Sequence, residues 1–385
     1  MRAGRWLTAV AAVAVVISGS ASQSSAESGP SPAWRLATLP DNKPTSNLWD
    51  VAAADATHAW AVGFDGYHPS DQYNTGVPMI LRWNGAEWSR AEVPPVPWKG
   101  SWRHVAAGSA TDVWVLGGPM SHGIDDSVTV VLHHDGNTWS EVPFPAGSTP
   151  SALSITDMSV VDGHVWLVGR RGSTPVTIEW TGAAWVEHQP PADCVRGSWP
   201  RFCTMAGIKA FAADDVWAVG NGFWTGFQGP LLYHWNGSAW RTVDIGLNGK
   251  MLTLQAIDGS SSKNVWAVGD TLNQGGGTLA VHGDGTTWQV VSGIPRKATP
   301  GVAVGAAGAP WVIGNNTTGR TTLITHTSGA WTETPAPTPA VPVGPAFNAI
   351  TAVPGTDRFI AVGSADLPGT SPLRVQAVVI EYAPA

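Results

Sequence analysis

One phrase of eight residues recurs along the chain. It reads DDVWAVGN at residues 214–221 and returns as THAWAVGF, TDVWVLGG, GHVWLVGR, KNVWAVGD and GAPWVIGN. Its tryptophan stands about every 50 residues, and we assign the seventh position to Phe359 in DRFIAVGS; the tryptophans are Trp60, Trp114, Trp166, Trp217, Trp266 and Trp311. A fixed period of this length indicates an array of similar units that fold as one body.

A second landmark follows each phrase after about 20 to 30 residues, namely a polar residue and a glycine before another tryptophan. The copies read NGAEW, DGNTW, TGAAW, NGSAW, DGTTW and SGAW. Asn-Gly and Asp-Gly supply the positive φ angles that a two-residue hairpin turn requires. Each copy therefore holds four strands, which we name a to d in chain order. In the fourth copy we expect them at 205–211, 216–220, 231–235 and 240–245. Four short strands in about 50 residues are typical of a propeller blade.

The seventh copy ends without its fourth strand, and the missing strand has a counterpart at the other end of the chain. The copy runs through VQAVVIEY at 375–382, while SPAWRLATLP at 31–40 has the form of GAEWSRAEVP. Pairing the two would remove two open sheet edges. We therefore predict an all-β fold, a seven-bladed β-propeller over residues 27–385. Its last blade combines residues 31–40 with 346–385.

The phrase itself has a structural explanation. In WAVG, the tryptophan and valine point to one face of strand b, and the alanine and glycine point to the other. Blades stack face to face, so the large residues of one blade can fill the space beside the small residues of the next. A buried tryptophan removes roughly 150–250 Å² from water. We interpret the repeated tryptophans as packing residues.

The amino-terminal residues are typical of an export signal. Arg2 and Arg5 precede an apolar run at 6–17, and small residues allow cleavage after Ala21 or Ala26. The run is too short to span a membrane comfortably. We therefore predict a signal peptide at residues 1–26 and a secreted protein without a membrane span.

Cys194 and Cys203 are the only cysteines. Because an exported protein meets an oxidising environment, we expect them to form a disulfide that closes one loop.

Charge and motifs exclude several classes of function. The net charge is −7 and no basic cluster is present, which argues against nucleic acid as a partner. The chain contains no HExxH, GxSxG or GxxxxGK motif. Its histidines show no spacing typical of metal ligands. We expect no cofactor, no metal and no catalytic activity.

The b–c and d–a connections are long and irregular, and we predict that they form the working face. They include residues 64–78, 118–127, 221–230, 270–277 and the cysteine loop. Rigid scaffolds often carry functional groups on such loops. The predicted binding residues are the aromatic residues of this face: Tyr67, Tyr73, Trp98, Trp199, Phe202, Phe223, Trp224 and Phe227. Exposed aromatic side chains are typical of protein-binding hot spots and of sugar platforms. Capping of the core by these side chains is the alternative.

The export signal, the WAVG and NGxxW landmarks and the shared blade together resemble a family of secreted propellers of high-GC actinobacteria. This family includes dispase autolysis-inducing proteins. The resemblance implies a non-catalytic extracellular protein that acts on neutral metalloproteases and is cross-linked by a secreted transglutaminase. Cross-linking requires accessible glutamines, and the candidates lie in the irregular loops: Gln72, Gln189, Gln228 and Gln274.

Our leading hypothesis is a protein-interaction module whose partners are extracellular proteins. One alternative is a lectin that stacks sugars, such as cell-wall glycan, on the aromatic residues. Lectin propellers usually repeat their site, whereas these loops differ in length and content. The other alternative is a glycoside hydrolase or lyase that uses two loop carboxylates about 5 or 6.5–9.5 Å apart. The candidate carboxylates are Asp65, Asp71, Asp125, Asp126, Asp193, Asp270 and Asp366.

Overall fold

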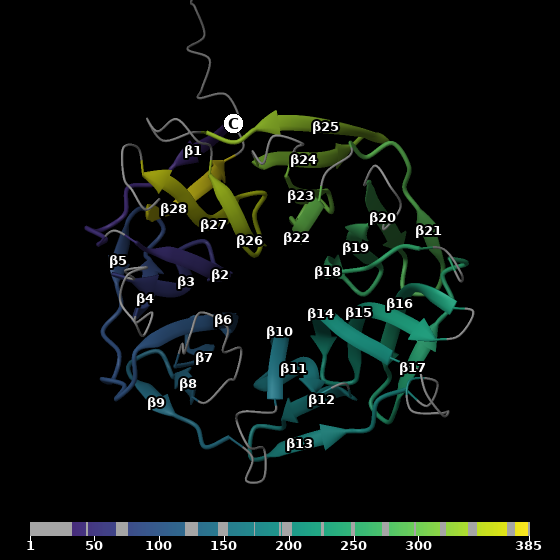
Figure 1. Cartoon of the computed structure of the whole chain (residues 1–385), viewed down its shortest axis with the longest axis horizontal. Helices are drawn as coiled ribbons and strands as arrows, with labels where there is room; N and C mark the ends of the chain where they lie inside the picture. The colour runs from purple at the N-terminus through teal and green to yellow at the C-terminus, as the bar shows by residue number, and fades with distance from the viewer. Residues whose placement is uncertain are drawn as a thin grey trace, which may run out of the picture. The chain divides into compact units, whose positions relative to one another are not determined.

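Figure 1 shows the computed structural model, coloured from purple at the amino end to yellow at the carboxyl end. The structure describes residues 33–43, 45–66, 76–119, 130–144, 153–172, 174–191, 194, 202–224, 227–247, 251–271, 277–295, 298–315, 321–337, 345–367 and 374–383. The predicted signal peptide lies outside these residues. The described residues belong to one unit, Pro32–Pro384, which consists of β-strands and their connections.

The strands form seven four-stranded sheets. Blade 1 contains β2 (Asn47–Asp55), β3 (His58–Asp65), β4 (Val77–Trp83) and β5 (Trp88–Arg90), and blade 2 contains β6 (Gly100–Ser109), β7 (Asp112–Pro119), β8 (Val130–His134) and β9 (Trp139–Glu141). Blade 3 contains β10 (Leu153–Val161), β11 (His164–Arg171), β12 (Thr174–Trp180) and β13 (Trp185–His188), and blade 4 contains β14 (Phe202–Ala212), β15 (Asp215–Trp224), β16 (Phe227–Trp235) and β17 (Trp240–Val243). Blade 5 contains β18 (Ala256–Ser261), β19 (Asn264–Asp270), β20 (Thr278–Gly283) and β21 (Trp288–Val290). Blade 6 contains β22 (Ala298–Val304), β23 (Pro310–Asn315), β24 (Thr321–Thr327) and β25 (Ala330–Pro335). Blade 7 contains β26 (Ala346–Ala352), β27 (Phe359–Leu367), β28 (Arg374–Ala383) and β1 (Ala33–Leu36).

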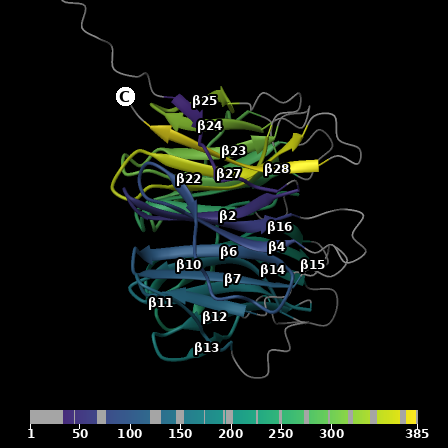
Figure 2. The same cartoon turned by 90° about the vertical axis from the view of Figure 1, so that its left-hand side faces the viewer.

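The sheets follow one another around a ring, and strand a of each blade lies nearest the centre (Figure 1). These inner strands contact one another in the order β2, β6, β10, β14, β18, β22 and β26, and β26 contacts β2 again. Figure 2 shows the unit from the side, with the strands running between its two faces. The a–b and c–d turns therefore lie on one face, and the b–c and d–a connections lie on the other. The seven-bladed propeller is confirmed.

The closing strand is also confirmed. The amino-terminal strand β1 pairs antiparallel with β28, and Trp34 stands opposite Tyr382. The Trp34 ring lies 5.5 Å from the Tyr382 ring and 5.3 Å from Trp311 of blade 6. Trp34 is only 6% exposed. The first strand of the ring thus occupies the position of strand d in the last blade.

Tryptophans from the two landmarks pack against each other across the junctions between blades. The strand b tryptophan of one blade contacts the strand d tryptophan of the next blade at 5.2–6.0 Å in five junctions: Trp114–Trp185, Trp166–Trp240, Trp217–Trp288, Trp266–Trp331 and Trp311–Trp34. Four of these pairs are T-shaped, with interplanar angles of 81–87°. This edge-to-face geometry is favoured because the positive ring edge meets the negative ring face. The interpretation of the tryptophans as packing residues is confirmed.

The glycine of the recurring phrase is required by a close approach of the backbone. In blade 1, strand a contains a β-bulge between Leu48 and Asp50. A Cβ atom added at Gly63 would overlap the backbone carbonyl oxygen of Asn47. The same overlap recurs in blade 4 between Gly220 and the carbonyl oxygen of Thr204. The glycine therefore permits pairing within a blade, whereas the sequence suggested only packing between blades.

The assignment of Phe359 to the seventh tryptophan position is wrong. Strand alternation places Ile360 there, because Val362 and Gly363 align with Val62 and Gly63 of blade 1. Ile360 faces blade 1, and Phe359 faces blade 6.

The junction between blades 7 and 1 uses polar contacts in place of a paired strand b tryptophan. The Trp88 indole donates to Glu381 Oε1 at 2.8 Å, and the Arg358 guanidinium lies 4.7 Å from the centre of the Trp83 ring.

The expectation that residues 221–230 form an irregular loop is also wrong. Strands β15 and β16 extend to Trp224 and Phe227, so they pair through almost the whole segment. Strand β14 lengthens with them, from an expected start at residue 205 to Phe202. Blade 4 therefore projects an ordered extension toward the b–c and d–a face.

The closing strand gives the first testable prediction. Trp34→Ala removes a buried ring that contacts both Tyr382 and Trp311, so the free energy of unfolding should fall by about 3–5 kcal/mol. Leu36→Ala on the same strand removes an exposed side chain and should change it by less than about 1 kcal/mol. Urea unfolding measures both. Equal effects of the two substitutions would contradict the proposed role of Trp34.

Candidate functional site

The structure covers part of the predicted working face. Several predicted residues lie outside the described ranges: Tyr67, Tyr73, Trp199, Gln72, Gln274, Asp71, Asp125, Asp126 and Asp193. Their roles remain predictions. The described candidates are Trp98, the aromatic residues of blade 4, three carboxylates (Asp65, Asp270 and Asp366, the last of which lies in strand β27) and two glutamines (Gln189 and Gln228).

Trp98 is a packed residue. Its ring lies 5.2 Å from the ring of Trp102 in a T-shaped arrangement, and it packs against the core between blades 1 and 2. Trp98 is half-buried. Its position matches the alternative in which a loop aromatic residue caps the core.

Four predicted aromatic residues lie in paired strands at one end of blade 4. The register places Phe202 opposite Phe223 and Trp224 opposite Phe227, at the end of the sheet where β15 turns into β16. We call these four residues the blade 4 platform. Sequence reasoning chose the residues but missed the strands that hold them, because the run NGFWTGFQGP is rich in glycine.

The predicted disulfide between Cys194 and Cys203 is confirmed and lies beside this platform. The two Cα atoms are 5.6 Å apart, and Cys203 is buried in strand β14. The Sγ atom of Cys194 also lies 3.4 Å from the hydroxyl of the buried Tyr233. Because Cys203 directly follows Phe202, the disulfide anchors the start of the platform to the preceding d–a connection.

Two of the candidate carboxylates have structural partners. Asp65 is only 5% exposed, forms an ion pair with Arg90 and accepts a hydrogen bond from the backbone N–H of Lys43 at 2.6 Å. Asp270 accepts a hydrogen bond from Gln255 at 3.0 Å. Asp65 thereby fixes the segment that joins β1 to β2, which is a role in ring closure.

Sequence reasoning missed a cavity on the axis of the ring. Its volume is about 960 Å³, and all seven inner strands line it. The lining extends from Ser154, near the start of β10, to Gly355, in the last a–b turn. The cavity therefore follows the inner strands along their length.

Two carboxyl groups in the cavity wall join neighbouring blades. Asp50 accepts hydrogen bonds from the backbone N–H of Val51 at 2.8 Å and of Val105, in blade 2, at 3.0 Å. Asp157 accepts from Met158 and from Ile208, in blade 4, both at 2.8 Å. Each carboxyl therefore links its own strand to the next inner strand.

Both carboxyl groups hold their protons more strongly than usual. Burial raises the pKa of Asp50 from 3.8 to about 6. Burial, with the charge of Asp50 as a second cause, raises the pKa of Asp157 to about 7. Desolvation disfavours the charged form, and here it outweighs the hydrogen bonds from the backbone, which favour that form.

Negative and positive side chains alternate along the cavity lining from blade 1 to blade 5. Blades 1 to 5 contribute Asp50, Arg103, Asp157, Lys209 and Asp258 in that order. The Arg103 guanidinium lies 4.7 Å from the centre of the Trp49 ring, and Lys209 Nζ lies 2.6 Å from Asp258 Oδ1. These residues escaped the sequence analysis because no motif marks them within strand a.

The histidines recur in a pattern that the sequence analysis also missed. In blade 4, Asp215 Oδ1 accepts from the Trp217 indole at 3.0 Å and lies 2.9 Å from His234 Nε2, while the His234 ring stacks on Trp217 at 4.2 Å. Blades 2 and 5 contain equivalent sets: Asp112, Trp114 and His133; Asn264, Trp266 and His282. These contacts fix the strand b tryptophan. The described residues contain no cluster of three side chains that could hold a metal ion.

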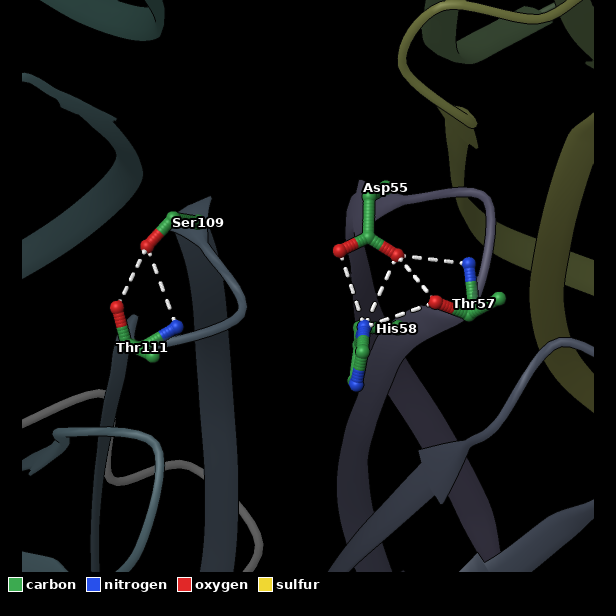
Figure 3. Close-up of polar contacts among 5 residues, drawn as sticks. All are labelled: Asp55, Thr57, His58, Ser109 and Thr111. Carbon is green, nitrogen blue, oxygen red and sulfur yellow. Dashed lines mark hydrogen bonds and ion pairs between the residues drawn. The ribbon is translucent and has the colours of Figure 1, made fainter.

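Polar residues on the opposite face organise the a–b turns. Figure 3 shows two neighbouring turns, one with Asp55, Thr57 and His58 and one with Ser109 and Thr111. Asp55 Oδ1 accepts from the backbone N–H of Thr57 at 2.7 Å and lies 2.9 Å from His58 Nδ1. Ser109 Oγ accepts from the backbone N–H of Thr111 at 3.2 Å. These short-range bonds are those of local turns.

Comparisons with known proteins show the fold alone. No family model matches the chain, and no curated protein matches its sequence. A structure of YCF48 bound to D1 peptide aligns with a TM-score of 0.57 and 15% identity, over 91% of this chain and 97% of that chain. The β-propeller domain of Cps50 (Swd1) from Myceliophteria thermophila aligns with a TM-score of 0.53 and 9% identity, over 89% and 98% of the two chains.

A third similar structure is a puromycin-hydrolyzing peptidase of Mycobacterium tuberculosis, with a TM-score of 0.53 and 15% identity. The alignment covers 90% of this chain but only 50% of the peptidase, so the chain spans half the length of that enzyme. Among the described residues, no helix combines the length and the hydropathy that a membrane crossing requires.

The cavity carboxyls predict a pH dependence of stability. Their pKa values are raised on folding, so their contribution to stability is complete below about pH 4 and is lost as the pH rises through 6 to 7. Between about pH 5 and pH 8, the free energy of unfolding of the wild type should fall. The fall in Asp157→Asn should be smaller than that in the wild type by on the order of 1–2 kcal/mol.

Urea unfolding at the two pH values measures this difference. Asp162→Asn is a matched control, because Asp162 is exposed in a turn with a positive φ that asparagine also tolerates. It should keep the wild-type pH dependence. An unchanged pH dependence in Asp157→Asn would contradict the assignment.

Proposed function

We propose that this protein is a secreted, non-catalytic binding protein that recognises an extracellular protein through its b–c and d–a face. The observation that carries the proposal is the blade 4 platform, in which Phe202, Phe223, Trp224 and Phe227 share one end of an extended sheet. Aromatic residues on a rigid support lose little conformational entropy when they bind. The neighbouring disulfide adds to that rigidity.

The fold similarity supports a protein or peptide as the partner. The YCF48 structure contains a bound D1 peptide, so a propeller of comparable architecture accommodates a peptide. A lectin is less well supported, because the b–c and d–a connections differ in length and content, whereas lectin propellers usually repeat their site. Of the carboxylates proposed for glycoside hydrolysis, Asp65 is held by an ion pair and Asp270 by a hydrogen bond.

The resemblance to secreted actinobacterial propellers adds a more specific proposal. The partner would be an extracellular neutral metalloprotease whose autolysis the protein affects, and a secreted transglutaminase would use the protein as a glutamine donor. Export would follow from the signal peptide at residues 1–26. Gln189 supports the second part, because it is exposed and directly follows strand β13.

Binding through the platform predicts the following result. In a pull-down from culture supernatant, the double variant Trp224→Ala/Phe227→Ala should recover at least about tenfold less partner than the wild type, because central aromatic anchors carry most of the binding energy. Val186→Ala/Val290→Ala, which changes exposed residues on the outer strands β13 and β21, should recover the wild-type amount. Equal recovery by both variants would reject the platform. Binding to a glycan array without a protein partner would favour the lectin.

Glutamine cross-linking predicts a second result. Transglutaminase with a labelled amine should modify Gln189, and Gln189→Asn should remove that label, since acyl transfer requires a mobile, accessible side chain. Gln289 is the internal control: it is exposed but lies in the middle of strand β21, where pairing holds its backbone. Peptide mapping by mass spectrometry measures both sites. Label on Gln289 and none on Gln189 would contradict the proposal.

A further inference from the structure

The axial cavity contains two carboxyl groups without a cationic partner. All bonds of Asp50 and Asp157 go to backbone N–H groups, and each carboxylate oxygen accepts one of them. An ionised carboxylate offers about four acceptor positions. Each group therefore keeps unused acceptor capacity in the wall of the cavity.

The cations of the cavity are engaged elsewhere. Lys209 pairs with Asp258 at 2.6 Å, and the Arg103 guanidinium stacks on Trp49. Another titratable group in the lining is His104, whose Nε2 lies 3.1 Å from the backbone carbonyl oxygen of Ile155. Together with Asp258, these are the charged and titratable side chains that face the two carboxyls from β6, β14 and β18.

The two carboxyl groups lie within each other's electric field. The charge of Asp50 is one cause that raises the pKa of Asp157. A positive charge between them would relieve this repulsion and would favour the ionised form of both groups. Lys209 acts on Asp157 through its charge but forms its ion pair with Asp258, so neither carboxyl of this pair has an ion-pair partner among the described residues.

We propose that the axial cavity binds an alkylammonium group, with Asp50 and Asp157 as its acceptors. The cavity volume of about 960 Å³ is in the range of small-molecule sites. An ammonium group offers three N–H donors, which is enough to serve more than one carboxylate. Its alkyl stem would contact the apolar lining beside these carboxyls, which includes Val51, Ile155 and Ile208.

The chemistry favours an organic cation over a metal ion. Calcium takes six to eight oxygen ligands and magnesium requires a near-octahedral set. The described lining offers two carboxyls without an ionic partner, each already bonded to two backbone N–H groups. The alkylammonium group has two chemical sources, a free small amine or the side chain of a lysine. This inference is independent of the platform on blade 4.

The first test uses the wild-type protein alone. Isothermal titration with n-butylamine at about pH 8 should show saturable binding, whereas 1-butanol, which has a similar shape and no charge, should bind at least about tenfold more weakly. At about pH 5, where both carboxyls are protonated, binding of n-butylamine should fall at least about tenfold. Absence of saturable binding at pH 8, or equal binding of the alcohol, would overturn the proposal.

The second test locates the site. Asp50→Asn and Asp157→Asn should each weaken binding of n-butylamine at least about tenfold, and Asp162→Asn, which removes an exposed charge, should leave it within about twofold. Wild-type affinity in both cavity variants would overturn the assignment. Titration with Nα-acetyl-lysine methylamide separates the two sources. If Nα-acetyl-lysine methylamide binds as tightly as n-butylamine, the source is a lysine side chain. If n-butylamine binds and the lysine derivative does not, the source is a free small amine.

Discussion

The edge-to-face contact between tryptophans of neighbouring blades is the interaction on which this structure most depends. A single blade is a four-stranded sheet with two apolar faces, and it becomes stable only when both faces are covered. The tryptophan of strand b reaches across one face and meets the strand d tryptophan of the next blade, as Trp166 meets Trp240 at 5.9 Å and 87°. Repetition of this contact converts a set of sheets into a ring.

The ring then imposes its own requirements. Its ends must meet, so Trp34 enters the last blade and contacts Trp311 as a strand d tryptophan would. The final junction departs from the pattern because Ile360 replaces the tryptophan, and Glu381 and Arg358 bind Trp88 and Trp83 instead. The ring also creates an axial cavity, where Asp50 and Asp157 join neighbouring inner strands by accepting backbone N–H groups.

The repeat was sufficient to predict the number of blades, the order of strands and the shared blade, and the two cysteines of an exported chain were sufficient to predict the disulfide. Phe359 was misplaced because the aromatic residue of the blade 7 phrase stands one position before the tryptophan position, and only the pairing register shows which side chain faces which blade. The extension of blade 4 was missed because the glycines of NGFWTGFQGP are typical of loops, whereas tertiary pairing holds them in strands. The cavity residues could not be found, since Asp50 and Asp157 line one cavity only once the inner strands of different blades stand around the axis.

The most direct test of the central contact is a double-mutant cycle on Trp166 and Trp240. If the two rings stabilise each other across the junction, the effects of Trp166→Leu and Trp240→Leu on the free energy of unfolding will be non-additive, with a coupling of about 0.5–1.5 kcal/mol. A second cycle between Trp166 and Trp88, which belong to different hydrophobic clusters, supplies the reference for additivity. A coupling of zero for Trp166 and Trp240, equal to that reference, would contradict the account.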